Sequence, residues 1–112
     1  MKIGKVSESV LKRSVLKHIK NNHTEIASGA GVGVDCAVFA SGNDSYVSAC
    51  TQAAVVMDSE DVLYLIHKAV NNLACTCALP KAALLTVTLP ESAQEETLKY
   101  FMQVSARICK EL

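Results

Sequence analysis

Apolar residues recur at helical spacing in three segments of the chain. The clearest segment starts with Asp58-Ser59-Glu60-Asp61, whose acidic side chains suit the positive end of a helix dipole. A first helix is predicted from Ser7 or Ser9 to Asn21-Asn22, and a last one from Ala93 to Leu112. The apolar stripe of the middle helix is Val62, Leu65, Ile66, Ala69, Val70 and Leu73, and that of the last is Leu98, Phe101, Met102, Ile108, Cys109 and Leu112.

Other segments have the pattern of strands. Residues Cys36 to Ala40 are continuously apolar, which predicts a buried central strand. The turn residues 41–44 and the extended pattern from Tyr46 to Cys50 complete a predicted hairpin. A third strand is predicted from Ala82 to Leu89, where apolar residues alternate with threonines between two prolines.

The predicted order of elements is therefore α-β-β-α-β-α. This order favours an α+β fold, with a small mixed or antiparallel sheet that is covered by helices on one face. Because the first strand is apolar throughout, the other face of the sheet is expected to need a partner. A second copy of the chain is the expected partner, since two-fold dimers are the commonest oligomers.

Composition narrows the range of partners and compartments. The chain has 112 residues, the length of a single domain, and 11 basic residues balance 11 acidic ones. A net charge of zero argues against nucleic acid or an anionic membrane as the main partner.

No run of residues has the pattern of a secretory signal or a membrane span, and the odd set of five cysteines is typical of reduced thiols, so a cytoplasmic location is expected. The cysteines are interpreted as small core or boundary residues rather than as a metal or redox site.

A glycine-rich segment, Gly29-Ala30-Gly31-Val32-Gly33-Val34-Asp35, is the main candidate for chemistry. Its spacing is G-x-G-x-G, which differs from the dinucleotide fingerprint, and it has no Gly-Lys-Ser/Thr of a Walker loop. Its backbone N–H groups are suited to phosphate, and Asp35 is suited to Mg²⁺. The alternative interpretation of the same residues is a plain glycine loop with Asp35 in a turn.

Several short motifs occur in an order that is similar to a known family. They are Gly31-x-Gly33-x-Asp35, Cys50-Thr51-Gln52, Asn71-Asn72-Leu73-Ala74 and the segment 84–90. Together they resemble the N-terminal domain of the aminoimidazole ribonucleotide (AIR) synthase-related proteins, over essentially the whole chain. The opening Lys2-Ile3-Gly4-Lys5-Val6-Ser7 and the helix after it resemble most the hydrogenase-maturation-factor branch.

The resemblance implies a nucleotide site and a dimer. Members of this family bind ATP and Mg²⁺ between two domains and activate an amide or carbonyl oxygen, and their N-terminal domains pair through a shared sheet core. Carried over by motif, Gly31, Gly33, Thr51 and Asn71 would bind nucleotide, and Asp35, Gln52 and Asn72 would face the metal. The resemblance assigns no residue of this chain a catalytic role.

Two departures from the family pattern change what the resemblance implies. Gln52 and Asn72 stand where the family has aspartates, so two of the three metal-binding carboxylates are neutral amides. The chain is also expected to be one domain, residues 1–112, without the C-terminal domain that completes the ATP site. The predicted function is therefore a degenerate domain that serves dimerisation or interaction and is catalytically silent alone. The alternative is the ATP- and Mg²⁺-binding half of an amide- or carbonyl-activating enzyme, completed by a missing domain.

Overall fold

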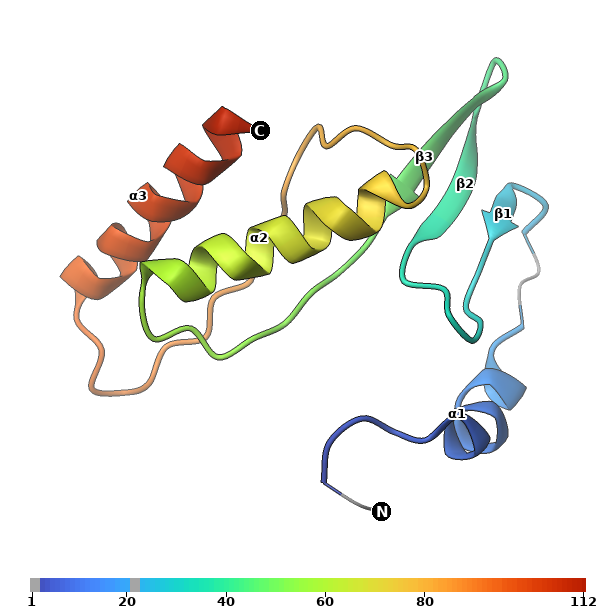
Figure 1. Cartoon of the computed structure of the whole chain (residues 1–112), viewed down its shortest axis with the longest axis horizontal. Helices are drawn as coiled ribbons and strands as arrows, with labels where there is room; N and C mark the ends of the chain where they lie inside the picture. The colour runs from blue at the N-terminus through green and yellow to red at the C-terminus, as the bar shows by residue number, and fades with distance from the viewer. Residues whose placement is uncertain (1–2, 21–22) are drawn as a thin grey trace. The chain divides into compact units, whose positions relative to one another are not determined.

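The computed structural model describes residues 3–20 and 23–112 of the chain. It divides into two compact units, residues 1–50 and 51–112, which are described separately. The described residues form an α+β protein with a three-stranded antiparallel sheet and three α-helices (Figure 1). The predicted α+β class and the antiparallel sheet are thus confirmed.

The first unit begins with a helix that is shorter than the sequence predicts. Helix α1 spans Glu8–Ser14 and is followed by a 3₁₀ turn, η1, at Leu16–His18. Val15, between them, leaves helical geometry with φ −123° and ψ −66°. The predicted helix end at Asn21-Asn22 lies outside the described residues.

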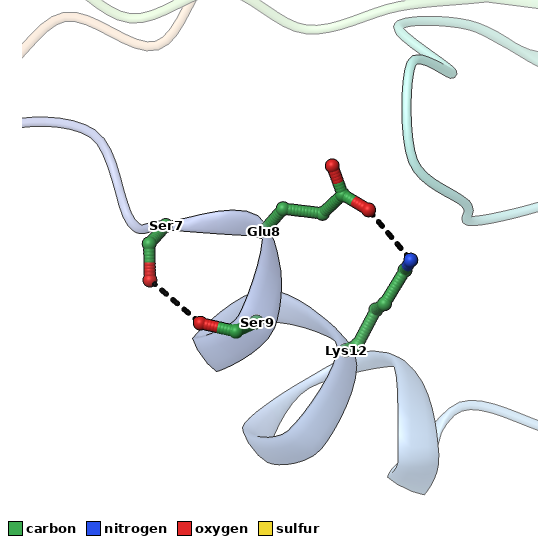
Figure 2. A network of polar contacts seen from close by, with 4 residues as sticks. All are labelled: Ser7, Glu8, Ser9 and Lys12. Atoms are coloured by element: carbon green, nitrogen blue, oxygen red, sulfur yellow. Dashed lines mark hydrogen bonds and ion pairs between the residues drawn. The ribbon is translucent and has the colours of Figure 1, made fainter.

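Local polar contacts support α1, which buries no residue. The Lys12 ammonium pairs with the Glu8 carboxylate one turn away, and the hydroxyls of Ser7 and Ser9 are 3.3 Å apart (Figure 2). Both members of the ion pair are 60% exposed, so it contributes only about 0.3–0.5 kcal/mol. An isolated helix of this length is marginal in water, which agrees with its early end.

The sheet contains the predicted hairpin and one strand that the sequence did not predict. Strands β2 (Ala37–Gly42) and β3 (Ser45–Ala49) pair antiparallel, and β1 (Ile26–Ser28) pairs with the other edge of β2. The hairpin turn is Asn43-Asp44, and both residues have positive φ, 50° and 57°. This is the conformation of the type I′ turn, which matches the twist of the strands and which Asn and Asp tolerate best among residues with a Cβ.

Two strand predictions were wrong. Residues 82–89 have no regular secondary structure and all of them are exposed, so the predicted third strand does not form within the described chain. Strand β2 is central, as predicted, but it is not buried: Phe39 is 38% exposed. No residue of β2 is buried, whereas Cys36, which directly precedes the strand, is only 5% exposed.

In the second unit, helix α2 (Ser59–Ala74) starts where the acidic cluster predicts. Asp58 caps the helix, with its Oδ1 accepting hydrogen bonds from the N–H groups of Glu60 (2.9 Å) and Asp61 (3.0 Å). The Asp61 carboxylate in turn accepts from the N–H of Asp58 at 3.4 Å and of Met57 at 2.8 Å. This reciprocal capping box satisfies N–H groups that the helix itself cannot.

The core of the second unit lies between α2 and α3 (Glu95–Glu111). Its buried members are Val62 and Ile66 from α2 and Val104 and Ile108 from α3. The polar Ser105 is buried beside them and donates a 2.8 Å hydrogen bond to the Phe101 carbonyl.

The predicted apolar face of the last helix was partly wrong. Ile108 is buried, but Met102, Cys109 and Leu112 are exposed, and Val104 takes a core position that was not assigned. The helix also starts at Glu95 rather than Ala93, because the backbone of Gln94 is extended, with φ −106° and ψ 160°. None of the described helices is both long and apolar enough to span a bilayer.

Candidate functional site

The glycine motif forms a tight turn in the first unit. The Val34 N–H donates to the Gly31 carbonyl at 3.4 Å, which closes a four-residue turn over Gly31–Val34. Gly33 has φ +74°, a left-handed conformation that residues with a Cβ rarely adopt. A Cβ on Gly31 would lie 3.3 Å from the Val34 side chain, while one on Gly33 would meet nothing within 4 Å. Glycine at position 33 thus avoids the strain that a Cβ would bring at this φ, and a Cβ there would point into open space.

Asp35 follows this turn directly and is exposed. No hydrogen bond or ion pair joins its side chain to another described residue. The next residue, Cys36, is the buried one that begins the path into β2. The structure therefore places one carboxylate on the surface, between the glycine turn and the start of β2.

The other predicted site residues belong to the second unit. Thr51 is exposed and Gln52 half-buried, in the irregular segment between β3 and α2. Asn71 and Asn72 lie in the last turn of α2, where the Asn71 carbonyl accepts the Cys75 N–H at 3.1 Å. Asn71 is exposed and Asn72 half-buried.

The seven predicted residues are therefore divided between the units. Gly31, Gly33 and Asp35 form one turn-and-loop segment of the first unit, and Thr51, Gln52, Asn71 and Asn72 form two sequence-local pairs in the second. Among the described residues no three His, Cys, Asp or Glu side chains are grouped to hold a metal ion.

The donor set does not fit a Mg²⁺–nucleotide site. Mg²⁺ takes hard oxygen ligands and is usually held by one or two carboxylates together with phosphate oxygens and water. Asp35 supplies the only carboxylate of the predicted set, and Gln52 and Asn72 supply neutral amides. At an effective dielectric of about 20, each missing carboxylate within ~4 Å of a dication removes several kcal/mol of attraction. No catalytic step through Mg²⁺ or ATP is derived for this chain.

A feature that the sequence pattern did not predict lies where α2 ends. The Cys77 N–H donates to the Ala74 carbonyl at 2.9 Å, and the Ala78 N–H donates to the Leu73 carbonyl at 3.2 Å. This pair of bonds is the Schellman motif, in which the left-handed position is normally glycine. Here that position is Cys77, with φ +58°.

The cysteines also differ from their predicted environments. Cys36 is buried and Cys50 half-buried, as expected of core or boundary residues. Cys75, Cys77 and Cys109 are exposed free thiols, which the prediction of small apolar positions did not anticipate.

Exposed apolar side chains occur along most of the described chain, and some lie together on one element of each unit. On the sheet, the half-buried Ile26 is paired with Phe39 and Phe39 with Val47, so the three lie in one row across the strands, in which Phe39 and Val47 are exposed. In the second unit, the segment 82–89 exposes Leu84 at 101%, Leu85 at 46% and Val87 at 48%. The backbone N–H and C=O groups of residues 82–89 form no hydrogen bond with the backbone of any described residue.

The surface between the two long helices has a depression of about 350 Å³. It is lined by Ser59, Glu60 and Leu63 from α2 and by Arg107, Ile108 and Glu111 from α3. It is shallow and carries both signs of charge, and Asp58 already occupies the N–H groups at the start of α2. It therefore has no set of convergent groups for a particular ligand.

Comparison of this chain with protein-family models, with curated proteins and with solved structures found no match.

Proposed function

We propose that this chain is an interaction domain that forms a homodimer and is catalytically silent alone, with a fold of the kind found in the N-terminal domain of AIR synthase-related proteins. The observation that carries the proposal is the row Ile26–Phe39–Val47 on the sheet. Phe39 remains 38% exposed and Val47 41% exposed, although both lie in a three-stranded sheet where one face normally packs against a core.

The energetic reason for a partner follows from these side chains. Burying the exposed part of a Phe or Val side chain contributes about 1 kcal/mol. A two-fold dimer buries each residue of a self-complementary patch twice, so a short apolar row gives a multiple of that gain. The chain also carries no net charge to oppose association of two copies.

The chemistry of the candidate site supports the second half of the proposal. A single exposed carboxylate, Asp35, follows a glycine turn, and the amides of Gln52 and Asn72 replace the other two acids of the family motifs. Neutral amides bind a hydrated dication weakly, and a nucleotide without its metal lacks the electrostatic stabilisation that phosphoryl transfer needs.

The dimer is tested by sedimentation equilibrium on two matched variants. Val47→Lys places a charge in the exposed row, and Tyr46→Lys places the same charge at the adjacent position, whose side chain lies on the opposite face of the strand. We expect Val47→Lys to weaken the dimer at least tenfold and Tyr46→Lys to change it little. Equal effects of the two variants, or none from Val47→Lys, would contradict an interface on this face.

The silent site is tested by calorimetric titration with ATP and Mg²⁺. The chain is expected to give little or no heat, and the double variant Gln52→Asp/Asn72→Asp is the comparison in which carboxylates are restored. Mg²⁺-dependent binding by the natural sequence at micromolar concentration would favour the alternative, the nucleotide-binding half of an ATP-dependent enzyme.

A further inference from the structure

The segment 81–91 carries a charge pattern that is symmetric about its centre. Lys81 precedes the apolar residues and Glu91 follows them, each five positions from Thr86. Both are exposed, and neither forms an ion pair with another described residue. Between them the segment is apolar or threonine until Pro90.

Antiparallel pairing of this segment with itself would match these features. If Thr86 of one copy lies opposite Thr86 of the other, Leu85 faces Val87, Ala83 faces Leu89 and Lys81 faces Glu91. Cross-strand apolar, Thr–Thr and opposite-charge pairs are the pairs that stabilise sheets, each by a modest amount. Parallel pairing in register would instead put Lys81 against Lys81 and Glu91 against Glu91, which is unfavourable.

The two prolines both remove an N–H from the same edge of the predicted strand, which leaves the other edge complete for pairing. In a strand, the N–H and C=O groups of alternate residues point to opposite edges. Pro80 and Pro90, which lack the N–H, are both even-numbered, so the edge formed by the odd-numbered residues 81–91 has a full set of donors. In the register centred on Thr86, these odd-numbered residues pair with one another.

The structure leaves this segment without a partner among the described residues. Residues 82–89 are all exposed and form no backbone hydrogen bond with a described residue. Leu85, Val87 and Leu89 are 46%, 48% and 39% exposed, and in a strand they would share one face. Unpaired N–H and C=O groups beside apolar side chains favour the addition of another strand.

We infer that residues 81–91 form a β-strand on contact with a second copy of this chain, by two-fold antiparallel pairing centred on Thr86. This inference rests on the proposed homodimer and names a second contact within it, in the other unit of the chain. The partner is a second copy rather than a different protein because the segment is complementary to itself in charge, in apolar pairs and in proline placement.

Charge reversal tests the register without changing the apolar residues. Lys81→Glu puts the new carboxylate of each copy against Glu91 of the other, at two places in the dimer, and Glu91→Lys puts two ammonium groups together in the same way. We expect each single variant to raise the dimer Kd about tenfold and the double variant Lys81→Glu/Glu91→Lys to restore it. The control is Lys99→Glu, an exposed lysine of α3, which should leave the Kd unchanged. A double variant as weak as the singles would overturn the inference.

Disulfide cross-linking tests the centre of symmetry. In a background where Cys75, Cys77 and Cys109 are serine, Thr86→Cys should give a covalent dimer on mild oxidation, because directly opposed residues have Cα atoms ~4.5–5.5 Å apart. The matched control Leu84→Cys lies opposite residue 88, so its two copies are about 13 Å apart and should not cross-link. Cross-linking of both variants or of neither contradicts the register.

Amide hydrogen exchange distinguishes the other possible occupant, a strand of the same chain. Protection of residues 82–89 that rises with protein concentration supports pairing between copies, and protection that is independent of concentration overturns it. The two proposals fail separately. If the natural sequence is a dimer but Thr86→Cys does not cross-link, the homodimer stands and the strand assignment is wrong. If the chain is monomeric, both are wrong.

Discussion

Replacing Cys77 by glycine should stabilise the second unit. Cys77 holds the left-handed position of the Schellman motif at the end of α2, with φ +58°. A residue with a Cβ costs about 1–2 kcal/mol there, and glycine avoids this cost. Glycine loses more chain entropy on folding, which offsets roughly 0.5–1 kcal/mol. The midpoints of these two ranges leave a net gain of about 0.75 kcal/mol, or roughly 3–6 °C in Tm for a domain of this size.

The assay is thermal unfolding followed by circular dichroism in reducing buffer, since no disulfide joins the described cysteines. Cys77→Ala is the matched control, because it removes the same sulfur but keeps a Cβ at positive φ. It should have nearly the Tm of the natural sequence. A Cys77→Gly variant that melts at or below the Cys77→Ala variant would refute the assignment of strain to this position.

Other predictions concern the core, the cap, the glycine turn and the thiols. Ile66→Ala should lower the free energy of unfolding by about 2–4 kcal/mol in denaturant titrations, whereas truncation of the exposed Leu63 should cost well under half of that. Asp58→Ala should cost about 1–2 kcal/mol, seen in the same titrations, because it removes the acceptor for two N–H groups of α2. Gly33→Ala should cost about 1 kcal/mol through its positive φ alone, and a neutral result would contradict the turn geometry. With a thiol reagent under native conditions, Cys75, Cys77 and Cys109 should react quickly, and modification of Cys36 at the same rate would contradict its burial.

The parts of the fold that the sequence predicted are those with strong local signals. Asp58 and Asp61 form a capping box whose partners lie within three residues, so the start of α2 needs no tertiary information. The hairpin turn at Asn43-Asp44 is similar, because few residue types accept positive φ at two successive positions.

The wrong predictions concern elements whose state depends on pairing or packing with residues far away in the sequence, which a local pattern does not reveal. The alternation at Leu85, Val87 and Leu89 indicates a strand, but a strand forms only when another one pairs with it. Helix α3 offers two apolar sets at helical spacing. One set is Phe101, Val104 and Ile108, and the other is Met102 and Cys109. Only packing against α2 decides which set lies toward the core.

The candidate site was likewise predictable only where its residues are close together in the sequence. The glycine turn was predictable from three closely spaced glycines, and its geometry is confirmed at Gly33. The association of Asp35 with Gln52 and Asn72 was carried over by motif order, and these residues lie in different units. Sequence order alone does not supply the contacts between them, and their functional roles stay predictions.

The most direct test of the proposed function is the mass of the chain in solution, measured by light scattering from ~10 to ~100 µM with and without Mg²⁺–ATP. The interaction-domain proposal predicts twice the 12.0 kDa mass of the chain at the upper concentrations, unchanged by nucleotide. A 12.0 kDa particle throughout, or a mass that changes when Mg²⁺–ATP is added, would contradict it.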